Sequence, residues 1–181
     1  MEDEDVLYIG MKEFAYLDQE IVNELDYRAI ETPGVASCFG VGFYDSDSGA
    51  VGLIHANRNK LDQVKEAIHV FDRELDVKFD NIEFWTTEQS YNREMGMQEG
   101  STWRITEGGK LVEELLSQKA RAEVRTNFAD TSVSIGVEYG EGIYLSDVET
   151  AERLDDPLGI INEDTNESDK LVVDMIHELR S

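Results

Sequence analysis

The sequence predicts an α+β fold in which helices flank a core of mixed β-sheet. Several segments alternate apolar and polar residues with the two-residue period of a strand, and others repeat apolar residues every three or four positions, as a helix does. Hydrophobic residues make up 40% of the 181 residues and include seven Phe, seven Tyr and two Trp. This content is too high for a disordered chain and predicts a folded core.

Strands are expected to dominate the N-terminal third of the chain. Residues 6–16, VLYIGMKEFAY, predict a first strand, and a polar stretch over 18–26 separates it from a short strand near 27–31. Residues 32–56 contain two apolar runs on either side of the turn-forming cluster 45–49, DSDSG. This segment therefore predicts a β-hairpin.

The hairpin is followed by a helix that is predicted over 60–75, with Asn59 as its N-cap. Its apolar residues recur at intervals of three and four and define one buried face: Leu61, Val64, Ile68, Phe71 and Leu75. A short strand is expected at 81–85. The polar stretch that follows, 86–109, is predicted to be a loop. Loops of this length often carry functional residues, and this one could also contain a helix that the pattern does not reveal.

The remaining sequence predicts further elements of both kinds. A helix is expected at 110–119, followed by strands at 122–127, 131–139 and 143–145. Ser146 and Glu149 form a capping box for a brief helix that ends before Pro157. A linker is expected at 162–169, and an amphipathic helix at 170–180 ends the sequence. His177 is expected on the outer side of this last helix. No internal repeat is found.

The charge of the chain restricts its partners and its location. There are 16 Lys and Arg against 40 Asp and Glu, so the net charge is −24, which argues against nucleic-acid binding. The acidic residues occur in every segment, as in proteins of a salt-rich cytoplasm, where screening makes such a surface tolerable. No apolar run approaches a membrane span, and the opening MEDED is unlike a secretory signal, so a cytoplasmic protein without membrane insertion is expected.

The sequence contains no pattern that predicts a metal or a cofactor. Three His and one Cys lack the close spacing of a zinc site, and the acidic clusters lack the ligand spacing of an EF-hand. There is no Gly-rich phosphate loop.

One pair of residues could support nucleophilic catalysis. If the hairpin turn is centred between Ser46 and Asp47, Cys38 lies directly opposite His55, with Cβ atoms about 4.5–5.5 Å apart. An imidazole that takes the thiol proton produces a thiolate, which the resulting ion pair stabilises. The small residues of TPGVAS could leave backbone amide groups free to stabilise the oxyanion of a tetrahedral intermediate. From spacing alone, the alternative of a buried packing cysteine and a structural histidine is favoured.

The segment TPGVASCFGVGFYDSDSGAVGLIH resembles the signature of the chemoreceptor glutamine deamidases, the CheD family. The shared positions, with intervals of six residues from Thr to Cys and 17 from Cys to His, are Thr32, Ser37, Cys38, Tyr44, Asp45, Gly49 and His55. The resemblance implies that Cys38 is the nucleophile, that His55 is the general base and acid, and that Thr32 orients the His or the substrate amide. The family's glycine-rich strand after the first long helix is replaced here by EFWTTEQS.

The resemblance also implies a fold, a function and partners. The fold would be the deamidase fold shared with the cytotoxic necrotizing factor toxins, over residues 1–145, and 146–181 would be a C-terminal helical extension. The expected activity is conversion of Gln to Glu on chemoreceptor cytoplasmic domains, with a CheC-type phosphatase as a further partner. The alternatives are a non-catalytic CheD-like adaptor that binds a chemotaxis signalling protein, and an unrelated halophilic domain with a chance motif.

Overall fold

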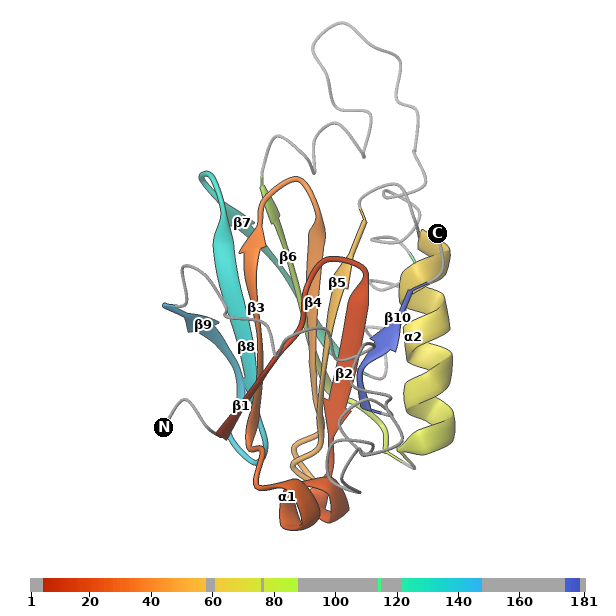
Figure 1. Ribbon diagram of the computed structural model, residues 1–181. Helices are drawn as coiled ribbons and strands as arrows, with labels where there is room; N and C mark the ends of the chain where they lie inside the picture. The colour runs from red at the N-terminus through yellow and green to blue at the C-terminus, as the bar shows by residue number, and fades with distance from the viewer. Residues whose placement is uncertain are drawn as a thin grey trace, which may run out of the picture.

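The protein is a mixed α+β structure built mostly from β-sheet, as the sequence predicts. The computed structural model describes residues 5–57, 61–75, 77–87, 114, 122–147 and 175–179. Two sheets face each other, and the long helix α2 (Leu61–Glu74) covers the outer side of the larger sheet (Figure 1). Within the described part, neither helix has the length and apolar character that crossing a bilayer requires.

The smaller sheet has four strands in the order β1-β3-β8-β9. These strands are β1 (Val6–Tyr8), β3 (Ala29–Val35), β8 (Val133–Glu138) and β9 (Gly142–Ser146). The β1–β3 pair is parallel and the other two pairs are antiparallel. The strands expected near 27–31, 131–139 and 143–145 are therefore confirmed, and β3 continues to Val35.

The larger sheet has six strands in the order β10-β2-β5-β4-β6-β7. Its strands are β10 (His177–Glu178), β2 (Glu13–Leu17), β5 (Val51–Ala56), β4 (Phe39–Tyr44), β6 (Asn81–Thr87) and β7 (Glu123–Ala129). Only β6 and β7 pair in parallel, so this sheet is mixed as well. The predicted hairpin is confirmed as β4 and β5.

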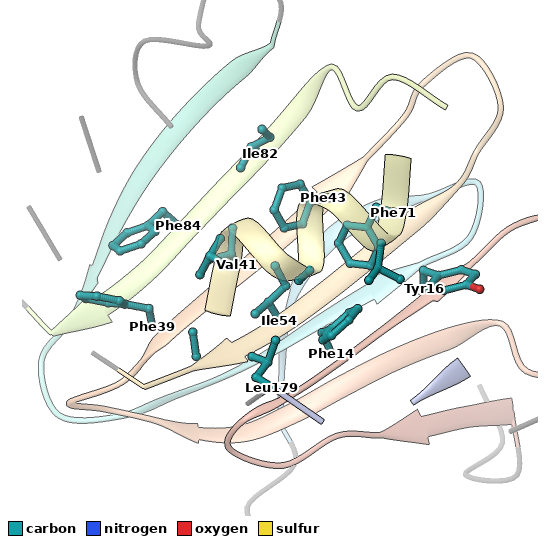
Figure 2. Close-up of a cluster of buried hydrophobic side chains, with 14 of the residues drawn as sticks. Phe14, Tyr16, Phe39, Val41, Phe43, Ile54, Phe71, Ile82, Phe84 and Leu179 are labelled. Carbon is teal, nitrogen blue, oxygen red and sulfur yellow. The ribbon is translucent and has the colours of Figure 1, made fainter. Parts of the chain in front are cut away.

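Two hydrophobic cores stabilise the layers. The first lies between α2 and the larger sheet, where Phe71 meets the rings of Phe14, Tyr16 and Phe43 at centroid distances of 5.5–6.0 Å (Figure 2). The second lies between the sheets and includes Leu7, Ile9, Ala15, Leu17, Ile30, Val35, Val51, Leu53, Ile135 and Val137. Burial of these apolar side chains supplies the main driving force for docking the three layers.

Glycines in β4 let the two sheets approach closely. A Cβ atom at Gly40 would collide with Ile135 Cδ1, and one at Gly42 would lie 2.9 Å from Ile143 Cγ2. Both partners belong to the smaller sheet, so the side of β4 that bears Gly40 and Gly42 faces the inter-sheet core. Side chains on this side of the larger sheet are brought against those of the smaller sheet.

Near the N-terminus, one predicted element is wrong and one helix was not predicted. The single strand at 6–16 is two strands, because a turn that contains Lys12 with φ 67° reverses the chain between them. The polar stretch 18–26 contains helix α1 (Gln19–Leu25), which the Asp18 side chain caps by accepting from Ile21 N at 2.9 Å. Helix α1 was missed because it buries none of its residues fully.

The predicted C-terminal helix over 170–180 is also wrong for residues 176–179, whereas Met175 is helical as expected. His177 and Glu178 form β10, which pairs with the edge of β2, and the His177 ring stacks on Phe14 at 4.8 Å. The apolar spacing does not distinguish the two arrangements, because Met175, Ile176 and Leu179 are buried although they flank the short strand and do not form a continuous helix. Most of the predicted loop 86–109, helix 110–119 and extension 146–181 lies outside the described residues.

Candidate active site

Thr32 and His55 meet across the two sheets. Thr32 lies on β3 of the smaller sheet and His55 on β5 of the larger sheet, and Thr32 Oγ1 is 2.7 Å from His55 Nδ1. Both side chains are buried, with exposed fractions of 0% and 4%. The structure thus brings together two of the three site residues that the sequence predicts.

The hydrogen bonds of Thr32 determine where the imidazole carries its proton. Thr32 Oγ1 donates its only hydrogen to the carbonyl oxygen of Ile9 at 2.9 Å. The same oxygen must therefore accept from His55, which requires the hydrogen on Nδ1. This tautomer leaves Nε2 with a free lone pair, the state that a general base needs.

Nε2 of His55 has an environment that keeps the ring neutral. It is buried and has no hydrogen-bond partner among the described residues. Burial disfavours the charged imidazolium and lowers the pKa of His55 to about 4. At pH 7 the ring is therefore an uncharged acceptor rather than half of an ion pair.

This burial predicts a pH dependence of stability. The unfolded chain binds a proton at His55 near pH 6.5, whereas the folded chain does so only near pH 4, so stability falls as the pH drops through this window. Between pH 7 and pH 4, we expect the wild type to lose about 3 kcal/mol more free energy of unfolding than His55→Gln does.

Urea unfolding at each pH measures this difference, and the matched control is His69→Gln, whose wild-type side chain is exposed on α2. The free energy of unfolding of His69→Gln should change with pH as that of the wild type does. Equal pH profiles for the wild type and His55→Gln would contradict the expectation.

Cys38 lies immediately before β4 and is half-buried. Its thiol donates to Met11 Sδ at 3.4 Å. Met11 belongs to the turn between β1 and β2, and 53% of its side chain is exposed. The nucleophile candidate therefore lies in the bend between β3 and β4, in contact with a half-exposed thioether.

The predicted pairing of Cys38 directly opposite His55 is wrong by two residues. Gly40 occupies that position, because the hairpin closes at Tyr44 and Val51 around a longer loop than expected. In this loop Asp45 N donates to Ala50 O at 2.9 Å and Gly49 N donates to Asp45 O at 2.8 Å. Cys38 therefore lies two residues before the position opposite His55, in the bend between β3 and β4 and outside the paired part of the hairpin.

The turn between β1 and β2 holds the site from one side. Lys12 N donates to His55 O at 2.7 Å, and Ile9 N donates to Glu31 O at 2.9 Å. Together with the bond from Thr32 to Ile9, these contacts attach the turn to both sheets. Sequence reasoning missed Ile9 and Met11, and only Gly10, a common turn residue inside the predicted strand, signalled this turn.

No three His, Cys, Asp or Glu side chains in the described part of the chain lie close enough together to hold a metal ion. The groups that the structure offers for chemistry are an oriented, neutral imidazole and, two residues before the position opposite it, a thiol. No protein-family model matches the chain, and no curated protein matches it either.

Proposed function

We propose that this protein is a cysteine-dependent amidohydrolase of the CheD type, which converts glutamine to glutamate on chemoreceptor cytoplasmic domains. The observation that carries the proposal is the buried hydrogen bond between Thr32 Oγ1 and His55 Nδ1. It orients an imidazole whose free Nε2 can accept a proton, and the chain's only cysteine lies two residues before Gly40, the position opposite His55. The CheD resemblance assigns nucleophile, base and orienting roles to the same three residues, Cys38, His55 and Thr32.

In the proposed reaction, Cys38 Sγ attacks the carboxamide carbon while His55 Nε2 takes the thiol proton. The tetrahedral intermediate then breaks its C–N bond, and the imidazolium returns that proton to the departing nitrogen, which leaves as ammonia. Water, deprotonated by Nε2, attacks the resulting thioester, and its proton passes back to the sulfur as glutamate is released. Because the pKa of His55 is about 4, proton transfer accompanies attack rather than preceding it as a stable ion pair.

Access to the thiol depends on Met11. The thioether contacts Sγ, but its side chain is half-exposed and unbranched, so it can rotate away from the sulfur. A glutamine side chain would then enter from the end of the sandwich.

A non-catalytic adaptor, which binds a signalling protein such as a CheC-type phosphatase, is the second candidate. One observation favours it: the thiol donates to Met11, and His55 Nε2 accepts no hydrogen bond from it. An adaptor would need neither a free imidazole lone pair nor a reactive sulfur. The two candidates therefore differ in the reactivity of Cys38.

Alkylation by iodoacetamide at pH 7 tests this reactivity on a chain with one cysteine. We expect His55→Gln to slow labelling of Cys38 by at least about tenfold, because it removes the general base. Mass spectrometry in about 1 M KCl, which screens the acidic surface, follows the labelled fraction. His69→Gln serves as the control and should label at the wild-type rate.

Equal labelling rates for His55→Gln and the wild type would favour the adaptor. The substrate assignment is tested separately by incubating the wild type with chemoreceptor cytoplasmic domains. Peptide mass spectrometry should then locate the glutamines that have become glutamates. Receptors that stay unchanged beside a reactive Cys38 would refute this substrate class.

A further inference from the structure

Two cross-strand rows of side chains face each other at the level of the candidate site. In the larger sheet, Gly40 pairs with His55 on one side and with Trp85 on the other. In the smaller sheet, the corresponding row is Thr32, Ile135 and Leu145. Thr32 meets His55, and Ile135 fills the space above Gly40. The next positions along the two rows are Trp85 and Leu145.

Trp85 carries a buried donor that has no partner. Its indole is half-buried against the inter-sheet core, and Nε1 has no hydrogen-bond acceptor among the described residues. An indole N–H can only donate, and leaving it unsatisfied costs about 1–3 kcal/mol. Such a group in a native structure calls for an explanation, and a bound water, ion or ligand that accepts the hydrogen bond is one of them.

The unpartnered donor and the unpartnered acceptor lie on opposite sides of β4. His55 Nε2 is on the β5 side of Gly40, and Trp85 is on the β6 side. Cys38 is two residues before Gly40, in the bend that joins β3 to β4, so the nucleophile candidate enters β4 next to the position that both ring-bearing residues flank. A backbone bond from Thr87 N to Ala36 O, 3.3 Å, attaches the segment before Cys38 to the end of β6.

Other donors near this row are already engaged. Asn127, which pairs with Trp85, donates through Nδ2 to Glu83 Oε2 at 3.3 Å. Arg125 is bound by Glu123 Oε1 at 2.5 Å and lies 3.8 Å from Glu83 Oε1. Thr86 Oγ1 is buried and unpartnered as well, but Thr86 follows Trp85 in β6 and so points to the opposite face of the sheet. Among these donors, Trp85 Nε1 is the one on the inter-sheet side that remains for a ligand.

We infer that Trp85 Nε1 donates a hydrogen bond to the carbonyl oxygen of the group that Cys38 attacks. The bond strengthens as negative charge develops on that oxygen in the tetrahedral intermediate, and no proton leaves the indole. The base and the oxyanion donor would thus flank the nucleophile from neighbouring strands. This role rests on the proposed amidohydrolase function. Trp85 lies in the segment EFWTTEQS, where the sequence departs from the CheD pattern.

Trp85→Phe removes the donor and keeps the aromatic bulk. We expect kcat for glutamine deamidation to fall by about 10²-fold with little change in KM, because the lost bond acts mainly in the transition state. The free energy of unfolding should stay equal or rise, since an unsatisfied buried donor disappears. A purely packing role predicts the reverse: lower stability and unchanged kcat.

A spectroscopic experiment tests the donor without relying on turnover. Iodoacetamide places a carboxamide on Cys38 Sγ, whereas methyl methanethiosulfonate adds a methylthio group that has no oxygen. In ¹⁵N-labelled full-length protein, the Trp85 indole N–H signal, assigned by its loss in Trp85→Phe, should move downfield with the first reagent only. The signal of Trp103 serves as an internal reference.

The outcomes separate this inference from the proposed function. An unmoved Trp85 signal on fully carboxamidomethylated protein, or wild-type kcat in Trp85→Phe, overturns the inference. A downfield shift in a wild-type protein that deamidates no glutamine leaves Trp85 as the carbonyl donor and refutes the deamidase assignment instead.

Discussion

Replacing Cys38 by Ala is expected to abolish ammonia release from receptor domains, with a loss in kcat of at least about 10⁴-fold. The thiol supplies the bond-forming atom in both halves of the proposed reaction, and the chain has no second cysteine. The fold should survive, because Cys38 is half-buried and precedes β4 rather than packing within it. A coupled ammonia assay measures the rate, and circular dichroism checks the fold.

The matched control for this variant is Ser37→Ala at the neighbouring exposed position. It changes the same loop and removes a hydroxyl group instead of the thiol, so its kcat should stay near that of the wild type. Ammonia release by Cys38→Ala at a comparable rate would exclude a cysteine nucleophile.

Thr32→Val is expected to reduce kcat by between about 10²- and 10⁴-fold, because the variant keeps the side-chain shape and removes the acceptor for His55 Nδ1–H. The ring then loses the bond that selects its tautomer, and Nε2 is no longer held as the free acceptor. The Nδ1 donor and the Ile9 carbonyl also lose their partner, which should lower stability by about 1–3 kcal/mol.

Thr32→Ser is the control that distinguishes the contribution of the Thr32 hydroxyl group to activity from that of its methyl group. It retains Oγ1 and should recover most of the activity, even if the lost methyl group weakens packing between the sheets. The labelling rate of Cys38 by iodoacetamide should follow the same order, with Thr32→Val slower than Thr32→Ser. A fully active Thr32→Val would remove the orienting role from the mechanism.

The fold class and most strands were predictable because their apolar patterns are local. The helix α2 repeats apolar residues at three and four positions, and the β4–β5 hairpin has alternating runs around a turn cluster. The strand β10 was not predictable, because it exists only through pairing with β2, more than 150 residues away in the chain. A two-residue strand has too little periodicity to compete with a helical interpretation.

The candidate site was only partly predictable for a related reason. The roles of Thr32, Cys38 and His55 came from a family resemblance, and spacing alone suggested just the pair of Cys38 and His55. The register between them depends on the loop after Tyr44, whose closing hydrogen bonds are not encoded in a simple turn motif. Met11 and Trp85 come from other strands, and no local pattern predicts that they lie beside the hairpin.

The hydrogen bond between Thr32 and His55 joins residues of two different sheets. A chain in which the hairpin has formed but the sheets have not docked holds its imidazole in no fixed direction. Under the proposed mechanism, its single thiol would therefore lack an oriented base throughout synthesis and early folding. The proposed chemistry would then begin only once the native sandwich is complete.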